Sequence, residues 1–411
     1  MITGRSFLKF FTLAFFLTAF FVSCSKDTNK PANKYFVSKE IALQLTKEYL
    51  TSLVDAVSVT NPEVSEIKPL IADDITVYKI VYKTTVNNQE VEASGLVCVP
   101  DTPGDYPVLS FQNGTNTVNA EAPSEMPNNY SYQMIELVAS LGYIVVISDY
   151  PGFGASSSVT HPYLVKEPTV RSLVDNLYAV KELATSELPD VNLINEYYLL
   201  GYSQGGWATL ALDKALESDY SDDFDLIGSA CGAGPYDIYL LLEGMVNAET
   251  YPMPVYLGYI VNAYTAYDQF TNPVSDIFNP PYASRISSLY TGMLTFDEIN
   301  SQLTTSIPDL LKPEFLAGFE TAPQYSTVRE ALNSNSVAAW HTYKPLMLLH
   351  GSDDTQVDPV STENIYNGMI MEGTSADICK KVIIPGAGHS SGIIPAMVRG
   401  IIFLNNLKIS R

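Results

Sequence analysis

The order of apolar segments along the chain is the sequence feature that most constrains its fold. From residue 108 onward, short apolar runs typical of buried strands alternate with longer stretches of helical periodicity. Such alternation predicts a mostly parallel, doubly wound sheet with helices on both faces, which is an α/β fold. The strand-like runs lie at residues 108–111, 143–148, 197–200, 226–231, 346–350 and 381–384, and the helical stretches lie near 131–141, 170–184, 204–216, 359–371 and from 393 onward.

Two segments of different character precede the alternating region. Residues 75–86 and 90–99 alternate apolar and polar side chains on either side of Asn87-Asn88, which predicts an antiparallel hairpin. Residues 35–54 have helical periodicity, so we expect a helix there.

The alternation stops between about residues 235 and 340. This stretch consists of short helical segments broken by Pro, and it holds 10 of the chain's 27 tyrosines. No Pro/Gly/Ser-rich linker sets it apart, so we expect residues 35–411 to form one domain that carries the stretch as a cap over the carboxyl edge of the sheet, where ligands bind in such folds. Together, the tyrosines of the cap are expected to line the substrate path, whereas any single one of them more often only packs the cap onto the sheet. These tyrosines include Tyr236, Tyr239, Tyr251, Tyr256, Tyr259, Tyr264 and Tyr267.

Charge and cysteine usage exclude several classes of function. The chain has 45 acidic and 23 basic residues and a net charge of −22, so it cannot neutralise a phosphate backbone, and no nucleic-acid partner is expected. Its four histidines form no HxH or HxxxH pair, so no metal site is expected. Cys98, Cys231 and Cys379 lie far apart among apolar neighbours, which indicates buried strand residues rather than a disulfide framework.

The N-terminus has the pattern of an export signal. Arg5 and Lys9 give it a basic start, residues 10–22 are apolar apart from two Thr, and Ser23 precedes Cys24. An uncleaved membrane helix is the alternative interpretation, but the apolar run is shorter than the ~20 residues that span a bilayer.

This N-terminus resembles a bacterial lipoprotein signal. The resemblance implies that residues 1–23 are removed as a signal peptide, that Cys24 is lipidated and that residues 24–34 form a flexible tether. Ser25, directly after the cysteine, resembles the pattern for sorting to the outer membrane. We therefore expect an exported protein anchored to the outer membrane by its lipid, on either the periplasmic or the external face.

The segment Gly201-Tyr202-Ser203-Gln204-Gly205 matches the GxSxG pattern of a nucleophile elbow. A strand-like run precedes it and a helical stretch follows it, which is the setting that such an elbow requires. Glycine is needed at both ends because a side chain there would crowd the turn, and the Ser203 hydroxyl would then be exposed at its tip. A tight turn without chemistry is the alternative interpretation.

A serine hydroxyl needs a base to become a good nucleophile. His389 lies in a glycine-rich loop directly after the last strand-like run, and we predict that it is this base. We interpret His350, at the end of a strand, as a packed or surface residue. His161 is interpreted as structural and His341 as incidental.

The base in turn needs a carboxylate that fixes its tautomer. The loop after the penultimate strand offers Asp353, Asp354 and Asp358. We predict Asp354 from its G-x-x-D-x-x-V spacing, with Asp353 as the second choice. The resulting chain order of serine, aspartate and histidine is that of α/β-hydrolases.

An oxyanion hole would complete this chemistry. The backbone N–H of Gln204 is the first predicted donor. The second should come from the loop after residues 108–111, as the N–H of Gly114 or Thr115. A glycine-containing loop without a catalytic role is the alternative.

Together, five motifs resemble those of the secretory lipase family of α/β-hydrolases, over about residues 78–404. The resemblance implies an α/β-hydrolase fold with a helical cap inserted between strands 6 and 7, and a carboxylic ester hydrolase that uses no cofactor. The motifs are Asp149-Tyr150-Pro151-Gly152-Phe153-Gly154, His161-Pro162-Tyr163-Leu164, Gly201-Tyr202-Ser203-Gln204-Gly205-Gly206, His350-Gly351-Ser352-Asp353-Asp354 and Gly388-His389.

The sequence thus predicts a serine esterase or lipase that cleaves a small-molecule or lipid ester through an acyl-enzyme on Ser203. A serine peptidase of the same fold is the main alternative, although such enzymes usually carry a large domain ahead of the catalytic one, and only about 70 residues precede the core here. A non-catalytic binding lipoprotein is the third, and it would be signalled by loss of the serine, histidine or aspartate. None of the three is lost. The acyl chain, the alcohol and the oligomeric state are not predicted.

Overall fold

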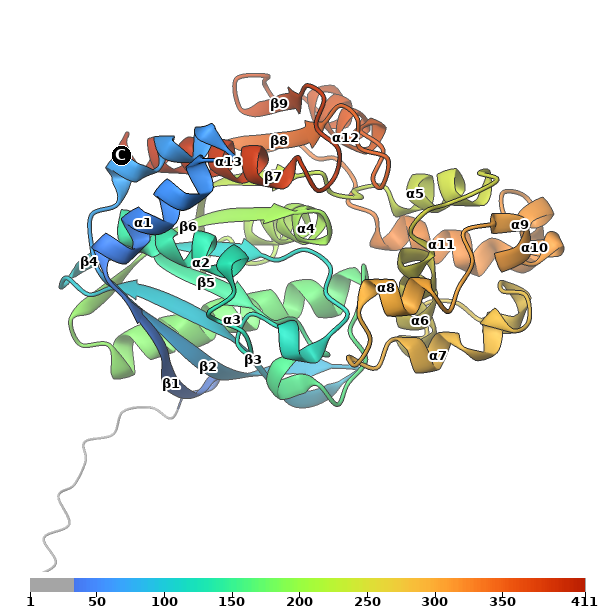
Figure 1. Cartoon of the computed structure of the whole chain (residues 1–411), viewed down its shortest axis with the longest axis horizontal. Coiled ribbons are helices and arrows are strands. Elements are labelled where there is room, and N and C mark those ends of the chain that lie inside the picture. The colour runs from blue at the N-terminus through green and yellow to red at the C-terminus, as the bar shows by residue number, and fades with distance from the viewer. Residues whose placement is uncertain (1–32, 411) are drawn as a thin grey trace, which may run out of the picture. The chain divides into compact units, whose positions relative to one another are not determined.

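A nine-stranded mixed sheet forms the centre of the computed structural model, which describes residues 33–410 (Figure 1). The expected signal peptide, Cys24 and nearly all of the expected tether lie outside these residues. The strands are β1 (Phe36–Leu45), β2 (Ile75–Val86), β3 (Gln89–Pro100), β4 (Gly104–Gln112), β5 (Ile144–Ser148), β6 (Val191–Tyr202), β7 (Asp225–Gly232), β8 (Leu346–Gly351) and β9 (Cys379–Ile384).

Helices follow most of the strands, as the alternation predicts. Those outside the expected cap are α1 (Lys47–Ser58), α2 (Tyr130–Glu136), α3 (Lys166–Glu187), α4 (Gln204–Ser218), α12 (Val360–Met371) and α13 (Ile393–Ile409). Those between β7 and β8 are α5 (Ile238–Val246), α6 (Pro254–Ala266), α7 (Ile286–Leu289), α8 (Phe296–Asn300), α9 (Ile307–Leu310), α10 (Pro313–Gly318) and α11 (Ser326–Asn335).

The sheet is parallel over two thirds of its width. Its strand order is β1-β2-β3-β5-β4-β6-β7-β8-β9, with antiparallel pairing from β1 to β5 and parallel pairing from β5 to β9. The hairpin of β2 and β3 turns at Asn87 and Asn88, both with positive φ, as a two-residue hairpin turn requires. The mostly parallel α/β sheet is therefore confirmed.

The N-terminal segment differs from the prediction of one helix over residues 35–54. Phe36–Leu45 form β1, which pairs with β2, and a helix begins only at Lys47. Two irregularities in the pairing, after Phe36 and after Ile41, shift the side chains between faces. Because of these shifts, the apolar residues of the strand do not follow a period of two and imitate helical spacing.

Two apolar cores lie on the two faces of the sheet. Along β6, Leu199 packs into the core shared with α3, α4, α12 and the helices between β7 and β8, whereas Leu200 packs into the core shared with α1, α2 and α13. Cys98, Cys231 and Cys379 are buried on strands, as predicted. None of the helices within residues 33–410 is both long and apolar enough to cross a membrane.

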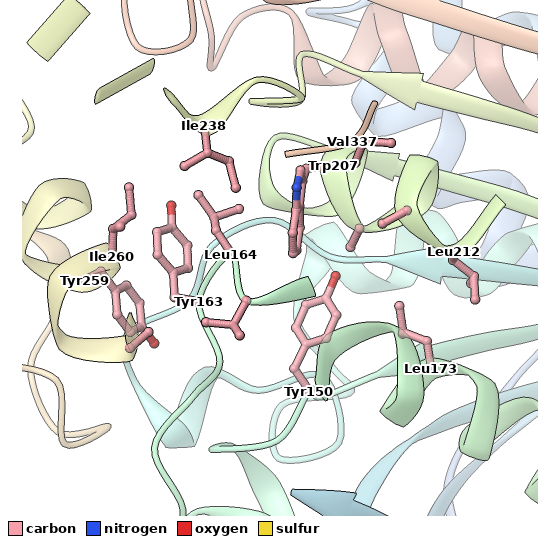
Figure 2. Packing of buried hydrophobic residues seen from close by; sticks show 14 of the residues in the cluster. Tyr150, Tyr163, Leu164, Leu173, Trp207, Leu212, Ile238, Tyr259, Ile260 and Val337 are labelled. Atoms are coloured by element: carbon pink, nitrogen blue, oxygen red, sulfur yellow. The ribbon is translucent and has the colours of Figure 1, made fainter. Parts of the chain in front are cut away.

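The segment between β7 and β8 forms a cap built only of helices and loops, at the right of Figure 1. β1 is an additional strand that precedes the first strand of the expected α/β-hydrolase fold. β7 and β8 therefore correspond to strands 6 and 7 of that fold, between which the cap was expected. Figure 2 shows the cap residues Ile238, Tyr259 and Ile260 beside Tyr163 and Leu164 of the sheet domain, all in one apolar core. The cap is thus fixed to the sheet domain by a continuous core.

Glu136, at the end of α2, gives a testable pH dependence. Its side chain is fully buried, and within the described residues its carboxyl oxygens have no hydrogen-bond partner. Burial raises the pKa of this carboxyl to about 8. Between pH 4.5 and 8 the folded protein therefore holds a proton that the unfolded chain releases, and stability falls as pH rises, by about 1.4 kcal/mol per pH unit from this group.

Glu136→Gln removes this titration. Urea unfolding of the variant and the parent should differ little at pH 5, and the variant should become progressively more stable than the parent toward pH 8. Unfolding midpoints that differ by the same amount at every pH would show that Glu136 does not ionise in this range.

Candidate active site

The site begins at the turn between β6 and α4. Ser203 occupies it with φ 59° and ψ −125°, a strained conformation for a residue with a side chain. A Cβ on Gly201 would meet the backbone of Gly205, and one on Gly205 would meet the Gln112 carbonyl, so both positions require glycine. The Ser203 N–H donates to the Gly232 carbonyl at 2.8 Å, which ties the turn to β7. The local geometry is that of the predicted elbow.

The structure brings His389 to this turn from the loop after β9. Its Nε2 lies 2.8 Å from the Ser203 Oγ, and its side chain is mostly buried. The hydroxyl of Tyr202, directly before the serine, donates to the His389 carbonyl at 2.7 Å. The same elbow therefore holds both the serine and the histidine loop.

Asp354 meets the other nitrogen of this histidine. Its Oδ2 lies 2.6 Å from the His389 Nδ1, while its Oδ1 accepts from the backbone N–H groups of Gln356 and Val357 at 2.9 and 3.0 Å. Burial alone would raise the pKa of Asp354, but hydrogen bonds from His350 and His389 hold it well below its usual range. The carboxylate is thus ionised and fully partnered at neutral pH.

The structure separates Asp354 from the second choice. The Asp353 side chain is exposed and accepts a hydrogen bond from its neighbour Ser352, and the Asp358 carboxylate caps the N–H of Val360. Asp354 is the carboxylate of this loop that the structure places on His389.

His350 has a function in the site that the sequence interpretation missed. It is fully buried, its Nδ1 lies 2.7 Å from the Thr362 hydroxyl, and its Nε2 lies 2.9 Å from the Val357 carbonyl and 3.2 Å from the Asp354 Oδ2. Because a carbonyl only accepts, the proton sits on Nε2, which also faces the aspartate. His350 therefore orients the Asp354 carboxylate. The sequence interpretation as a packed residue was correct for its burial but missed this contact.

His161 holds the residue that follows the nucleophile. Its Nδ1 donates to the Pro151 carbonyl at 2.9 Å, so its Nε2 accepts from the Gln204 side-chain amide at 2.8 Å. Burial lowers the pKa of His161 to about 4, which keeps the ring neutral and in this tautomer. His161 thus has the predicted structural role, and the residue that it holds in place is Gln204, next to Ser203. His341, by contrast, is exposed and distant from this network.

The predicted oxyanion loop lies against the elbow. A Cβ built on Gly114 would be 4.0 Å from the Cβ of Ser203. The Asn113 carbonyl accepts from the Tyr150 hydroxyl at 3.1 Å, which fixes the peptide plane that carries the Gly114 N–H, and the Thr115 hydroxyl pairs with Tyr163 at 3.1 Å. This backbone is therefore held rigidly beside the serine.

Two cavities reach Ser203 and His389. The larger is about 670 Å³ and also contacts Gly114 and Thr115. The smaller is about 20 Å³ and lies toward the cap, beside Gln204. A ligand in either cavity would touch the serine, but their sizes differ so much that only the larger admits a sizeable group.

Most of the cap tyrosines named from the sequence do not reach the two cavities at Ser203. Of those named from the sequence, Tyr256 lines both cavities and Tyr251 lines the smaller one. Tyr259 instead stacks between Tyr163 and Tyr290, with ring centroids 4.4 and 4.6 Å apart, and so joins cap to sheet domain. Most of the larger cavity is lined from outside the cap.

No group of three or more His, Cys, Asp or Glu side chains within residues 33–410 is arranged to hold a metal ion. The side chains around Ser203 instead form a chain of hydrogen bonds from hydroxyl to imidazole to carboxylate. That arrangement can take a proton from the serine as its oxygen attacks an electrophilic carbon.

Comparisons with known proteins identify the family and the fold. A family model described as secretory lipase matches residues 126–384. A candidate hydrolase from Legionella pneumophila has 25% identity and a TM-score of 0.80, with 91% of this chain and 98% of that chain covered. A search of curated proteins finds no match.

Two further solved structures share the fold at lower identity. The rice cell wall degrading esterase LipA from Xanthomonas oryzae has 21% identity and a TM-score of 0.77, covering 92% of this chain and 98% of that one. Candida antarctica lipase A in its closed state has 15% identity and a TM-score of 0.67, covering 92% and 82%. The architecture is therefore that of the α/β-hydrolases.

Proposed function

This chain belongs to the secretory lipase family and is a hydrolase of the lipase and esterase type, and from this premise we propose that it cleaves carboxylic esters through an acyl-enzyme on Ser203. One observation carries the proposal: the unbroken hydrogen-bond chain from the Ser203 Oγ through His389 to Asp354, at 2.8 and 2.6 Å. The strained elbow that presents the serine supports the same role.

Acylation proceeds by attack of the Ser203 Oγ on the ester carbonyl carbon. The hydroxyl proton moves to the His389 Nε2, and the ionised Asp354 stabilises the resulting imidazolium through Nδ1. The carbonyl oxygen becomes an oxyanion that accepts from the N–H of Gln204 and from that of Gly114 or Thr115. The bond from carbon to the alcohol oxygen then breaks, and the leaving alkoxide takes the proton from Nε2.

Deacylation repeats these steps with water. His389 takes a proton from the water as its oxygen attacks the acyl carbon, and the second oxyanion uses the same N–H donors. The bond between that carbon and the Ser203 Oγ breaks, the proton passes from Nε2 to the serine, and a carboxylic acid leaves. No cofactor enters these steps, because protein groups supply every proton transfer.

The proposal is tested by comparing ester with amide substrates. The full chain should hydrolyse p-nitrophenyl esters and leave aminoacyl p-nitroanilides of the same acyl size essentially uncut. Efficient amide cleavage would favour the serine peptidase alternative. Loss of both activities in a folded protein would favour a binding lipoprotein.

We also propose that the protein is exported and anchored by a lipid on Cys24. The family description as secretory lipase supports export, and the basic start, short apolar run and cysteine of the N-terminus support the anchor. Expressed from its full sequence, the Cys24→Ser variant should leave the membrane fraction or remain as an uncleaved precursor. An unmodified mature N-terminus elsewhere in the parent protein, found by mass spectrometry, would contradict the anchor.

A further inference from the structure

Most of the residues that line the larger cavity belong neither to the Ser203–His389–Asp354 triad nor to the cap. One wall is a single face of α13, on which Ile394, Met397, Val398 and Ile401 follow a helical repeat. The facing wall comes from the N-terminal segment that precedes the hairpin. This cavity thus runs away from Ser203 between two helical elements far apart in sequence.

The facing wall is built by α1 and the 3₁₀ turn that follows it, residues Pro62–Glu66. Val57 and Val64 line the cavity from this segment, and Ile67 continues the wall just after the turn. Figure 1 shows α1 and α13 on the same side of the sheet, where both belong to one apolar core. The segment before residue 78, where the resemblance to the secretory lipases begins, therefore contributes to the cavity at Ser203.

The lining of the larger cavity is uncharged and mostly apolar. None of the residues that line this cavity carries a carboxylate, ammonium or guanidinium group, in a chain with 45 acidic and 23 basic residues. Phe111 and Ile135 add to its apolar surface. Thr60, Asn61 and Ser131 add hydroxyl and amide groups from exposed or partly exposed positions. A charged group would lose its water in this cavity without meeting an opposite charge, whereas a hydrocarbon gains from burial.

The dimensions suit an extended chain. The lining positions on α13 from Ile394 to Ile401 are seven steps of the helix apart, or about 10 Å along its axis. Tyr130 and Ile393, 49% and 41% exposed, lie on the solvent side of the cavity. The small cavity toward the cap has space for little more than a water molecule.

We propose that the cavity between α1 and α13 binds an unbranched hydrocarbon chain of the ester, so that the N-terminal segment sets chain-length preference. This inference rests on the proposed esterase activity and adds its substrate class. The occupant follows from continuity with Ser203 and His389, which line the same cavity, and from the absence of charge along it. The cap then closes the site more than it selects the substrate.

The test fills the cavity from its N-terminal wall. In the full chain, Val57→Trp and Ala56→Trp each place an indole at a lining position. Ala56 is exposed, and Val57 is partly buried at the margin of the apolar core, so neither change replaces a fully buried side chain. Ser52→Trp is the matched control, because Ser52 is exposed on the same helix and does not line the cavity. Circular dichroism checks that all three variants fold.

The readout is the ratio of kcat/KM for p-nitrophenyl octanoate to that for p-nitrophenyl acetate. Burial of each methylene favours the longer chain by roughly fourfold, so the parent should prefer octanoate by at least about tenfold. The two cavity variants should lower this ratio by about tenfold or more, and the Ser52→Trp control should keep it. An unchanged ratio in both folded cavity variants, in this series and the alcohol series below, overturns the proposal.

A second series fixes the acetyl group and compares octyl acetate with ethyl acetate by acid release. A shift in the acyl series alone places the acyl chain in the cavity, and a shift in the alcohol series alone places the alkyl chain of the alcohol there. Either result supports the hydrocarbon site. If the parent hydrolyses no ester of either series, the proposed function itself fails, which is a different outcome from unchanged ratios in an active enzyme.

Discussion

Ser203→Ala is expected to abolish ester hydrolysis, lowering kcat by about 10⁴-fold or more, because no acyl-enzyme can form without the hydroxyl. The turn itself should persist, since its backbone is held by the Ser203 N–H bond to β7 and by the flanking glycines rather than by the hydroxyl. Initial rates on p-nitrophenyl butyrate measure the loss, and thermal unfolding checks the fold.

An exposed serine on α1 provides the control for this variant. Ser52→Ala removes a hydroxyl outside the cavities around the active site and should keep the parental rate. A Ser203→Ala protein that retains a tenth or more of parental activity would mean that another nucleophile, or a directly activated water, carries the reaction.

His389→Ala should lower kcat by a factor on the order of 10⁴ or more, and Asp354→Asn by a somewhat smaller factor. The Nε2 of His389 lies 2.8 Å from the Ser203 hydroxyl, so loss of this imidazole leaves the serine without a base. The asparagine keeps the shape of the carboxylate but removes the negative charge that stabilises the imidazolium.

The matched control for the carboxylate is its neighbour. Asp353→Asn makes the same chemical change one residue away, on an exposed side chain bonded to Ser352, and activity should stay near the parental value. Steady-state kcat and KM, measured for His389→Ala, Asp354→Asn and Asp353→Asn, show which of the two aspartates supports His389. A severe defect in Asp353→Asn beside a harmless Asp354→Asn would reverse the assignment.

Local sequence patterns were sufficient to predict the elbow. Ser203 lies between an apolar strand and a helix, and the flanking glycines are dictated by backbone contacts that any such turn must make. The loops of Asp354 and His389 follow β8 and β9, and parallel strands bring their carboxyl ends to one edge of the sheet. The order of the strands in the sequence, together with their parallel arrangement, therefore predicts that Ser203, Asp354 and His389 lie close together.

The supporting residues were not predictable in the same way. His350 acts through a contact of 3.2 Å with Asp354 that depends on how its loop folds back, and no spacing rule encodes that. The bond from Tyr202 to the His389 carbonyl joins residues 187 positions apart. Such contacts are set by tertiary packing, and a single sequence contains no signal for them.

The same limit applies to the N-terminal region, where the predicted helix was wrong, and to the cap. Irregular pairing of β1 gave its apolar residues a spacing that resembles a helix. The cap is rich in tyrosine, which suggested a substrate path, but the rings of Tyr163, Tyr259 and Tyr290 stack on one another and fill the interface instead. Composition identifies which side chains are present, and only packing decides whether they face a cavity or a core.

The most direct test of the central claim is to identify the nucleophile by covalent labelling. A fluorophosphonate should react with the full chain to one equivalent, and peptide mass spectrometry should place the phosphonyl group on Ser203, with labelling lost in His389→Ala because the serine then lacks its base. Stoichiometric labelling of any other residue, or none in a protein that still hydrolyses esters, would contradict the account.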